Sequence, residues 1–260
     1  MSSSSTTPDS KSRWKDVSLA IVTPTLGQVT VGYCKSMIAL THHLTKLNIT
    51  HGTCVQAGCT LLAEARSALV AGFLASPSGT HLLMVDADEE FAPDVVLRLL
   101  AADRDAVGVA TPMKSVNVAR VVAAAREGHP NPAVFGQEFG NAGLGPGVDP
   151  GDGVVEASWL GTGFVMMKRA ALERMVAAYP ELTCRTSLYP KGPLCFLFQQ
   201  MVEDGEILGE DTSFFRRWTR IGGKCHVLLD ATIGHAGQQT FVGNLAQSLA
   251  LTRTLSVPRA

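Results

Sequence analysis

Short apolar runs alternate with longer segments of helical periodicity through the first part of the chain, and this alternation constrains the fold more than any other feature. Val17–Thr23 and His81–Val85 are apolar and have the length of strands, whereas Ala57–Ala75 is rich in alanine and leucine, which favour helices. Repeated strand–helix units are typical of α/β proteins, in which crossover helices join parallel strands. The pattern therefore predicts an α/β fold with a doubly wound, mostly parallel sheet.

Other elements follow from the same periodicities, whereas one long stretch shows none. Gly128–Gly153 is rich in glycine and proline, which predicts an irregular loop of a length that is often functional. The remaining segments are expected as strands at Ile49–Val55, Ala106–Ala110, Val154–Trp159, Phe164–Lys168 and Val227–Leu229, and as helices at Val31–Leu47, Asp94–Ala102, Arg169–Tyr179 and Glu210–Ile221.

The length and composition suit one domain. The chain has 260 residues, of which 46% are hydrophobic, so it can form a sizeable core. We expect a disordered tail at 1–14, one domain at 15–240 and a C-terminal segment at 241–260. No apolar run reaches the roughly 18 residues that span a bilayer and no apolar leader is found, which predicts a cytoplasmic protein without integral membrane association. The 22 basic and 23 acidic residues disfavour, without excluding, a mainly electrostatic nucleic-acid binder.

Two carboxylates directly follow an apolar strand. Asp86-Ala87-Asp88 comes at the carboxyl end of His81–Val85, and open α/β sheets bind their ligands at such ends. Carboxylates on either side of one small residue suit a hard divalent cation that also holds phosphate oxygens. Glu89 and Glu90 extend the run of acids, and a cation would relieve their mutual repulsion. The alternative is that Asp86 and Asp88 only cap the turn, and we favour the cation site.

His235 and Glu210-Asp211 are further candidates. His235 stands in a glycine-rich turn after the last expected strand, where small neighbours allow close backbone approach. This placement favours a metal ligand over a surface histidine. Glu210-Asp211 opens a helix, so its carboxylates are either helix caps or a general base for a substrate hydroxyl.

Basic residues and one glycine-rich turn complete the set of candidates. Arg66 on the helix Ala57–Ala75, and Lys114 after a strand, are either solvated charges or ligands for nucleotide phosphate. The turn Trp159-Leu160-Gly161-Thr162-Gly163 offers an apolar platform with close backbone approach, or is a strand–turn–strand around a core tryptophan. The basic run from Arg216 to Lys224 is most simply a solvated helix face.

Four blocks of the chain resemble those of GT-A type glycosyltransferases, in particular compact soluble forms found in bacteria and bacteriophages. Val17–Thr25 resembles their first strand and nucleotide-facing turn, and His81–Phe91 resembles their DxD block. Gly161–Arg169 resembles their acceptor-side block, and Gly209–Gly237 resembles their catalytic acid pair followed by a metal-binding histidine. The resemblance spans about residues 17–240, and the order and spacing of the blocks make it more specific than the DxD motif alone.

This resemblance implies an inverting hexosyl- or related transferase that moves a sugar from a nucleotide-sugar, often a UDP-sugar, to a hydroxyl acceptor with Mn2+ or Mg2+. It implies a nucleotide-sugar half at 15–115 and an acceptor and catalytic half at 154–240. The nucleotide-sugar contacts that it implies are Thr23, Pro24, Thr25, Arg66, Asp86, Ala87 and Lys114. The metal ligands are Asp86, Asp88 and His235; the catalytic base is Asp211 with Glu210 beside it; and the acceptor side holds Trp159, Gly161, Thr162 and Gly163.

One departure from the family concerns the acceptor. The family's acceptor loop is often marked by a QxxRW-type sequence, of which only Arg217-Trp218 is present. The acceptor is therefore open between a saccharide or other small hydroxylated molecule and a hydroxymethylated pyrimidine in DNA. The second would place the enzyme in a host cytoplasm if the chain is of phage origin, and its base would have to be flipped out of the duplex.

Two other function classes compete with a transferase. A haloacid-dehalogenase-like phosphatase also has DxD after an apolar strand, but here Glu89-Glu90 follows the second aspartate and several α/β units precede it. A non-catalytic module that binds a nucleotide-sugar or carbohydrate is the third class. The presence together of Asp86, Asp88, Asp211 and His235 favours the transferase over both.

Overall fold

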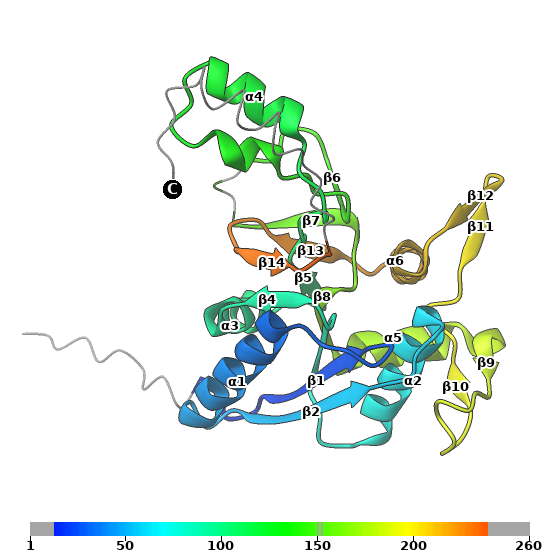
Figure 1. Ribbon diagram of the computed structural model, residues 1–260. Helices are drawn as coiled ribbons and strands as arrows, with labels where there is room; N and C mark the ends of the chain where they lie inside the picture. The colour runs from blue at the N-terminus through cyan, green and yellow to red at the C-terminus, as the bar shows by residue number, and fades with distance from the viewer. Residues whose placement is uncertain (1–12, 150, 152, 239–260) are drawn as a thin grey trace, which may run out of the picture.

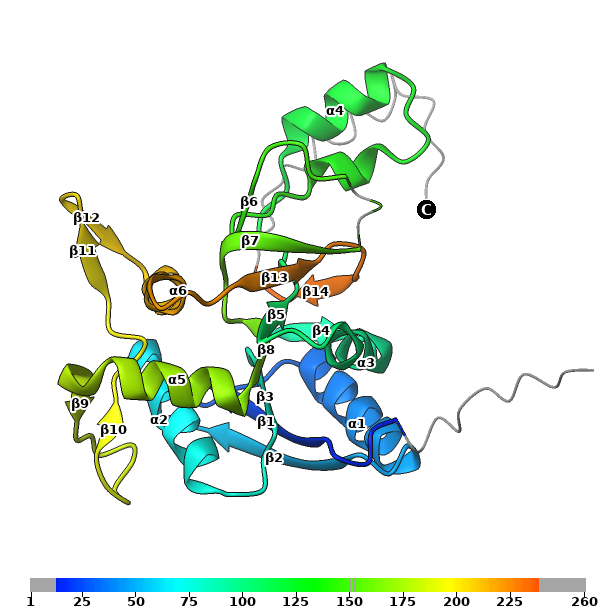
Figure 2. The same ribbon diagram turned by 180° about the vertical axis from the view of Figure 1, so that it is seen from behind.

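The computed structural model describes residues 13–149, 151 and 153–238. The segment expected at 241–260, and the expected tail except for its last two residues, lie outside these described residues. The main sheet has eight strands (Figures 1 and 2). They are β1 (Ser18–Pro24), β2 (Thr50–Gln56), β3 (His81–Val85), β5 (Ala106–Gly108), β6 (Ala142–Leu144), β7 (Val154–Leu160), β8 (Phe164–Lys168) and β13 (Cys225–Leu228).

The strands follow the order β2-β1-β3-β8-β5-β13-β7-β6 across this sheet. β1 is parallel to β2 and β3, and β5 is parallel to β13. β8 is antiparallel to β3 and β5, and β7 is antiparallel to β13 and β6. Only β7 and β8 among these strands run against the common direction, so the predicted α/β class and mostly parallel sheet are confirmed.

Helices cover both faces of the sheet. α1 (Val31–Lys46) and α3 (Pro93–Ala102) pack on one face, and α2 (Leu62–Ala75), α5 (Arg169–Ala178) and α6 (Glu210–Arg220) pack on the other (Figure 2). In β3, Leu83 and Val85 pack in the core on the α1 and α3 face, whereas Leu82 and Met84 pack in the core on the opposite face. Because successive side chains of a strand point to opposite faces, a strand covered on both sides is apolar throughout, which is why β3 has no polar alternation.

The glycine- and proline-rich stretch is partly ordered into short elements. It contains a 3-10 helix at Pro132–Gly136 and strand β6, which pairs with β7. Helix α4 (Val118–Arg126) precedes it and has no counterpart among the predicted elements. α4 stands away from the sheet in Figure 1, and Ala124 is its only buried residue. No helix among the described residues is long and apolar enough to cross a membrane.

Two sequence predictions differ from the structure near the carboxyl ends of the strands. His235 lies in a strand, β14 (Ile233–His235), and not in a turn, because β14 pairs antiparallel with β4 (Glu89–Phe91). α2 begins at Leu62 rather than at residue 57. Its expected first turn is a loop in which Gly58 has a left-handed φ of 77° and Cys59 donates its backbone N–H to the carbonyl of Thr25.

Besides the pair of β4 and β14, the described residues form two further two-stranded antiparallel sheets. The first pairs β9 (Thr183–Cys184) with β10 (Leu194–Cys195), and the second is the hairpin of β11 (Met201–Glu203) and β12 (Glu206–Leu208). The hairpin projects from the body just before α6, as Figure 1 shows.

Candidate active site

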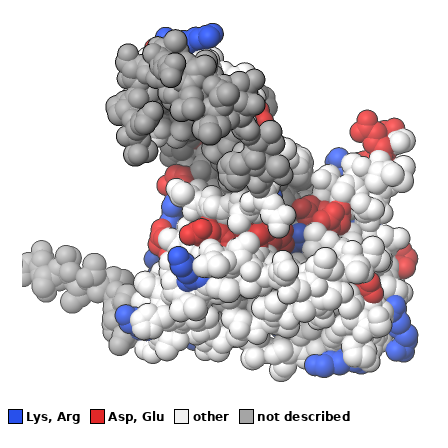
Figure 3. Space-filling view, viewed as in Figure 1, with Lys and Arg blue, Asp and Glu red and all other residues white. Residues whose placement is uncertain are grey.

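A cleft of about 520 Å³ opens beyond the carboxyl ends of β1 and β3. Parallel strands end at the same edge of a sheet, so the residues after β1 and β3 meet there. In Figure 3 acidic side chains form a band across the middle of the molecule. Of the residues predicted to bind a nucleotide-sugar, those that line the cleft are Pro24, Thr25, Asp86, Ala87 and Lys114.

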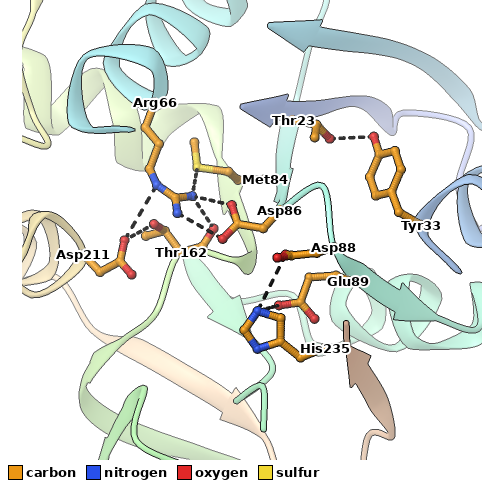
Figure 4. Close-up of polar contacts among 10 residues, drawn as sticks. All are labelled: Thr23, Tyr33, Arg66, Met84, Asp86, Asp88, Glu89, Thr162, Asp211 and His235. Atoms are coloured by element: carbon orange, nitrogen blue, oxygen red, sulfur yellow. Dashed lines mark hydrogen bonds and ion pairs between the residues drawn. The ribbon is translucent and has the colours of Figure 1, made fainter. Parts of the chain in front are cut away.

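Three side chains that could hold a metal ion converge beside this cleft (Figure 4). They are Asp88, Glu89 and His235, and their candidate ligand atoms lie within 4.8 Å of one another. Nε2 of His235 is 3.6 Å from Oδ1 of Asp88 and 4.0 Å from Oε1 of Glu89. The pairing of β14 with β4 places His235 directly opposite Glu89 and so brings these two groups together.

The imidazole of His235 is held in the orientation that a metal ligand requires. Its Nδ1 is 2.8 Å from the backbone oxygen of Pro112. A carbonyl oxygen only accepts, so Nδ1 carries the proton and the neutral ring presents the lone pair of Nε2 to Asp88 and Glu89. Metal-binding histidines are commonly fixed by such a hydrogen bond from their other nitrogen.

Glu89 is the most unusual carboxylate of the group. Its side chain is 1% exposed, and Oε2 has no hydrogen-bond partner among the described residues. Burial, together with the nearby charges of Asp86 and Asp88, raises the pKa of Glu89 to about 9. A buried carboxyl oxygen without a partner is costly, and a cation bound at this point would satisfy it. The donor set of two carboxylates and an imidazole therefore fits a divalent cation such as Mn2+ or Mg2+.

Asp86 lies close to this trio, but its carboxylate pairs with Arg66 of α2. Nη2 of Arg66 donates to Oδ2 of Asp86 at 3.2 Å, and Nη1 lies 3.1 Å from Oδ1. The buried guanidinium also donates to the backbone oxygen of Thr162 at 3.0 Å and to the sulfur of Met84 at 3.3 Å. Burial alone would lower the pKa of Arg66, but Asp86 and Asp211 outweigh it and raise that pKa. Arg66 is therefore a fixed internal cation and is not among the described residues that line the cleft.

Asp211, at the first turn of α6, joins the same network. The hydroxyl of Thr162 donates to Oδ1 of Asp211, and Nε of Arg66 is 3.9 Å from that oxygen. The side chain of Asp211 is 28% exposed. Glu210 is half-buried beside it and adds to the negative potential that Arg66 experiences. The structure thus connects the acid of α6 with Asp86 through one arginine and one threonine (Figure 4).

The remaining candidates have varied surroundings. The ammonium of Lys114 contacts Asp88 at the cleft, and the Lys114 side chain is 40% exposed. Thr23 is buried, and its hydroxyl is 2.7 Å from that of Tyr33, so it is turned away from the cleft. Trp159 is half-buried and packs against the core of the α2, α5 and α6 face. Among the described residues, the cleft lining includes neither Thr23 nor Trp159.

Gly163 is required where the turn after β7 approaches the carboxylates. A Cβ at this position would lie 3.0 Å from Oδ2 of Asp86 and 3.4 Å from Oε1 of Glu89. The backbone oxygen of Gly163 also accepts the N–H of Asp86 at 2.7 Å. Gly161 is similarly tight, since its Cβ would lie 3.0 Å from Cβ of Asn141. The glycines of this turn therefore permit close packing of the site.

Replacing Gly163 by alanine is expected to displace the carboxylates. Crowding of this kind costs about 1–3 kcal/mol, so the melting temperature should fall, and binding of Mn2+ should weaken with it. Gly192→Ala is the matched control, because its Cβ would meet nothing within 4 Å. Thermal unfolding and Mn2+ titration of both variants measure the effect. Equal melting temperatures and Mn2+ affinities of the two variants would show that the turn can accommodate a Cβ at residue 163.

Two participants in the site were not found by sequence reasoning. The sequence indicates Glu89 only as one member of an acidic run. In the structure Glu89, and not Asp86, groups with Asp88 and His235. Tyr33, which holds Thr23, was not singled out. The acidic run itself was the available signal for Glu89, but the direction of each side chain depends on the pairing of β4 with β14.

No protein-family description matches the chain, and no curated protein of related sequence was found. Solved structures with a similar chain path include A197 from STIV, at 13% identity and a TM-score of 0.44, covering 88% of this chain and 100% of that one. A mutant Drosophila β-1,4-galactosyltransferase 7 with manganese, UDP-Gal and xylobiose has 11% identity and a TM-score of 0.43, covering 88% of this chain and 78% of that one. A glycosyltransferase involved in glycosylation of the major capsid of PBCV-1 has 11% identity and a TM-score of 0.39, covering 92% and 100%. Likenesses with TM-scores below 0.5 do not establish a shared function.

Proposed function

We propose that the protein is a metal-dependent glycosyltransferase that moves a sugar from a nucleotide-sugar, most simply a UDP-sugar, to a hydroxyl acceptor. The observation that carries this proposal is the trio of Asp88, Glu89 and His235 beside a cleft at the carboxyl ends of parallel strands. A divalent cation held by carboxylates at a cleft is suited to binding the oxygens of a diphosphate. The resemblance of the four sequence blocks to GT-A enzymes supports the same function.

In this proposal the trio binds Mn2+ or Mg2+, and the cleft binds the donor. The cation would supply neutralisation of the charge that develops on the leaving diphosphate. Lys114 offers a second, partly exposed cation at the cleft, suited to phosphate oxygens. Pro24 and Thr25 line the wall that the nucleotide would contact. Thr23 and Arg66 act in this proposal through neighbouring residues rather than by contact with the donor. The hydroxyl of Thr23 pairs with Tyr33, and the terminal nitrogens of Arg66 contact Asp86, Met84 and Thr162.

Asp211 is the proposed general base, and the reaction is proposed to invert the sugar. The carboxylate of Asp211 takes the proton of the acceptor hydroxyl, and the acceptor oxygen uses the freed electron pair to bond to the anomeric carbon. The bond between that carbon and the diphosphate oxygen breaks, and its electron pair stays on the diphosphate. One base suffices for a single displacement, and Glu210 is the neighbour that contributes to the local charge.

A saccharide or other small hydroxylated molecule fits as the acceptor better than DNA. The exposed basic residues of the run from Arg216 to Lys224 have carboxylate partners on the protein itself. Arg216 and Arg220 both pair with Glu203, at 2.8 and 2.7 Å, and Lys224 pairs with Glu156 at 2.8 Å. A DNA binder relies on unpaired basic side chains to neutralise phosphates. The acidic band in Figure 3 also repels a polyanion.

A phosphatase reaction through Asp86 is disfavoured by the contacts of that residue. The nucleophilic aspartate of such an enzyme needs a free oxygen directed at the phosphorus, whereas both oxygens of Asp86 lie against Arg66. Ion pairing with a buried guanidinium also makes a carboxylate a weaker nucleophile.

A thermal-shift survey of nucleotide-sugars tests the proposed function. UDP-, GDP- and CMP-sugars are added to the protein with Mn2+ or with EDTA. A ligand present at 100 times its Kd stabilises the native state by about 2.7 kcal/mol, which raises the melting temperature measurably. We expect a UDP-sugar to do so with Mn2+ and to lose most of the effect with EDTA. If no nucleotide-sugar shifts the melting temperature in the presence of Mn2+, the proposed function is wrong.

Replacing Glu89 by glutamine is expected to weaken Mn2+ binding and to change its pH dependence. With a pKa of about 9, Glu89 is protonated at pH 7 in the metal-free protein, so a cation must displace that proton. Wild-type affinity should therefore rise between pH 7 and pH 9, by up to about tenfold per unit, and Glu89→Gln should flatten this rise. The free Mn2+ signal in electron paramagnetic resonance measures both.

Glu89→Gln is expected to weaken Mn2+ binding but to stabilise the metal-free protein. The folded state binds more protons than the unfolded state between the ordinary pKa of 4.5 and about 9, so Glu89 lowers stability as pH rises through this window. Glu89→Gln should thus raise the melting temperature at pH 8 without metal. Glu90→Gln, an exposed neighbour, is the control. Wild-type Mn2+ affinity in Glu89→Gln would remove Glu89 from the ligand set.

A further inference from the structure

Arg66 is buried at the centre of the site, and its three side-chain nitrogens differ in their contacts. The residue is 1% exposed, and its two terminal nitrogens are engaged by Asp86, Met84 and the backbone oxygen of Thr162. Nε has no hydrogen-bond partner among the described residues and lies 3.9 Å from Oδ1 of Asp211. A buried N–H without a partner is unfavourable, so this one favours any arrangement in which the carboxylate of Asp211 comes closer.

Thr162 contacts both charged groups at once. The residue is 0% exposed, its backbone oxygen accepts from Arg66, and its hydroxyl donates to Oδ1 of Asp211 (Figure 4). It is fixed by the turn between β7 and β8, in which Gly163 accepts the N–H of Asp86. Oδ1 of Asp211 is therefore directed inward, and Figure 4 shows the other carboxylate oxygen turned away from Thr162 and Arg66.

We infer that Thr162 and Arg66 are positioning residues for Asp211, an inference that rests on the proposed function, in which Asp211 is the base. They hold Oδ1 so that Oδ2 is the oxygen that faces the acceptor and receives its proton. A base acts only within about 2.6–3.2 Å of the proton's oxygen, and a displacement of about 1 Å can cost about 100-fold in rate. Arg66 also pairs with Asp86, so the same guanidinium sets the separation between the base and the aspartates after β3.

Thr162→Val is the variant that tests this inference most sharply. Valine has nearly the shape of threonine but cannot donate a hydrogen bond, and the backbone contact to Arg66 is retained. With UDP-glucose or UDP-galactose, Mn2+ and water as acceptor, we expect kcat for UDP release to fall about 10- to 100-fold. The donor KM should change less than about twofold, because Thr162 is not among the described residues that line the cleft.

Two further variants separate positioning from packing. Thr162→Ser keeps the hydroxyl and should restore kcat to within about threefold of the wild type. Arg66→Lys keeps the charge but has a single nitrogen, so it cannot serve Asp86 and Asp211 together, and its kcat should fall as well. A Thr162→Val variant with wild-type kcat, or a Thr162→Ser variant as impaired as Thr162→Val, would overturn the inference. So would a rise in donor KM at constant kcat.

Failure of the inference is distinguishable from failure of the proposed function. If the wild type releases no UDP in a metal-dependent way, the proposed function and this inference both fall. If the wild type is active but Asp211→Asn retains full release, Asp211 is not the base and this inference falls, whereas metal-dependent transfer stands. If the wild type is active, Asp211→Asn is inactive and Thr162→Val is unimpaired, only the positioning role falls. Circular dichroism melting of each variant identifies any loss of activity that is due to unfolding.

Discussion

Replacing Asp211 by asparagine is expected to stop sugar transfer while leaving donor binding intact. Asparagine has the shape of aspartate and can still accept the Thr162 hydroxyl through its amide oxygen, but it cannot take a proton from an acceptor. General-base catalysis contributes about 10²- to 10⁴-fold, so kcat should fall by that factor. Since Asp211 is not among the described residues that line the cleft, the affinity for UDP and Mn2+ should change little.

Two measurements and two further variants test the role of Asp211. Product release measures kcat, and calorimetric titration of UDP in the presence of Mn2+ measures donor affinity. Glu206→Gln, in the exposed hairpin before α6, is the control for loss of an acid from this region. Glu210→Gln tests the adjacent acid. Intact transfer in Asp211→Asn, together with its loss in Glu210→Gln, would exchange the roles of the two residues.

Replacing Asp88 by asparagine is expected to abolish metal binding and turnover without unfolding the protein. Asp88 belongs to the trio with Glu89 and His235, and its loss should weaken Mn2+ binding by more than the roughly 10- to 100-fold that loss of an outer partner costs. Turnover that depends on the cation should fall with it. The variant also loses the contact with Lys114, but ion pairs this exposed contribute only about 0–1 kcal/mol.

Folding and metal binding can be measured separately for this variant. The melting temperature without metal should stay near that of the wild type, because the contact of Asp88 with Lys114 is partly exposed and contributes little to stability. Mn2+ titration by electron paramagnetic resonance should show the loss of binding. Asp94→Asn, in the first turn of α3, is a control for loss of a carboxylate elsewhere. Wild-type Mn2+ affinity and turnover in Asp88→Asn would contradict the assignment of the metal site.

The fold could be predicted because its strands are marked by local composition. β3 and β8 begin and end as expected, since a strand buried on both faces is apolar along its whole length and is bounded by polar or glycine residues. The reversal of β8 is not visible in the sequence. β8 lies between β3 and β5 and opposes both, which depends on packing between segments far apart in the chain.

The site could be predicted as a set of residues but not as a geometry. Asp86 and Asp88 flank one residue, yet they have different partners, Arg66 for Asp86 and His235 for Asp88. This difference arises because the chain turns after β3 and enters β4, whose partner β14 lies about 140 residues later. A three-residue strand has no sequence signature of its own. For this reason the sequence predicts a turn at His235 and does not indicate Glu89 as a metal ligand.

Arg66 illustrates a second limit of sequence reasoning. α2 is apolar on most of its surface, and its buried residues form nearly a continuous run from Ala65 to Val70. Without a polar face, the sequence does not show which side packs on the sheet. An arginine on such a helix is expected at the surface unless carboxylates are available to pair with it. Asp86 and Asp211 provide them from β3 and α6, elements that are distant in sequence.

The most direct test of metal-dependent sugar transfer is the release of nucleoside diphosphate from UDP-glucose and UDP-galactose by the purified protein, with Mn2+ and with EDTA. Even without an acceptor, water can take its place slowly, so the assay requires only donor, metal and protein. We predict UDP release with Mn2+ that stops with EDTA and is absent in Asp88→Asn. Release that persists in EDTA, or no release from any nucleotide-sugar in the presence of Mn2+, would contradict a metal-dependent glycosyltransferase.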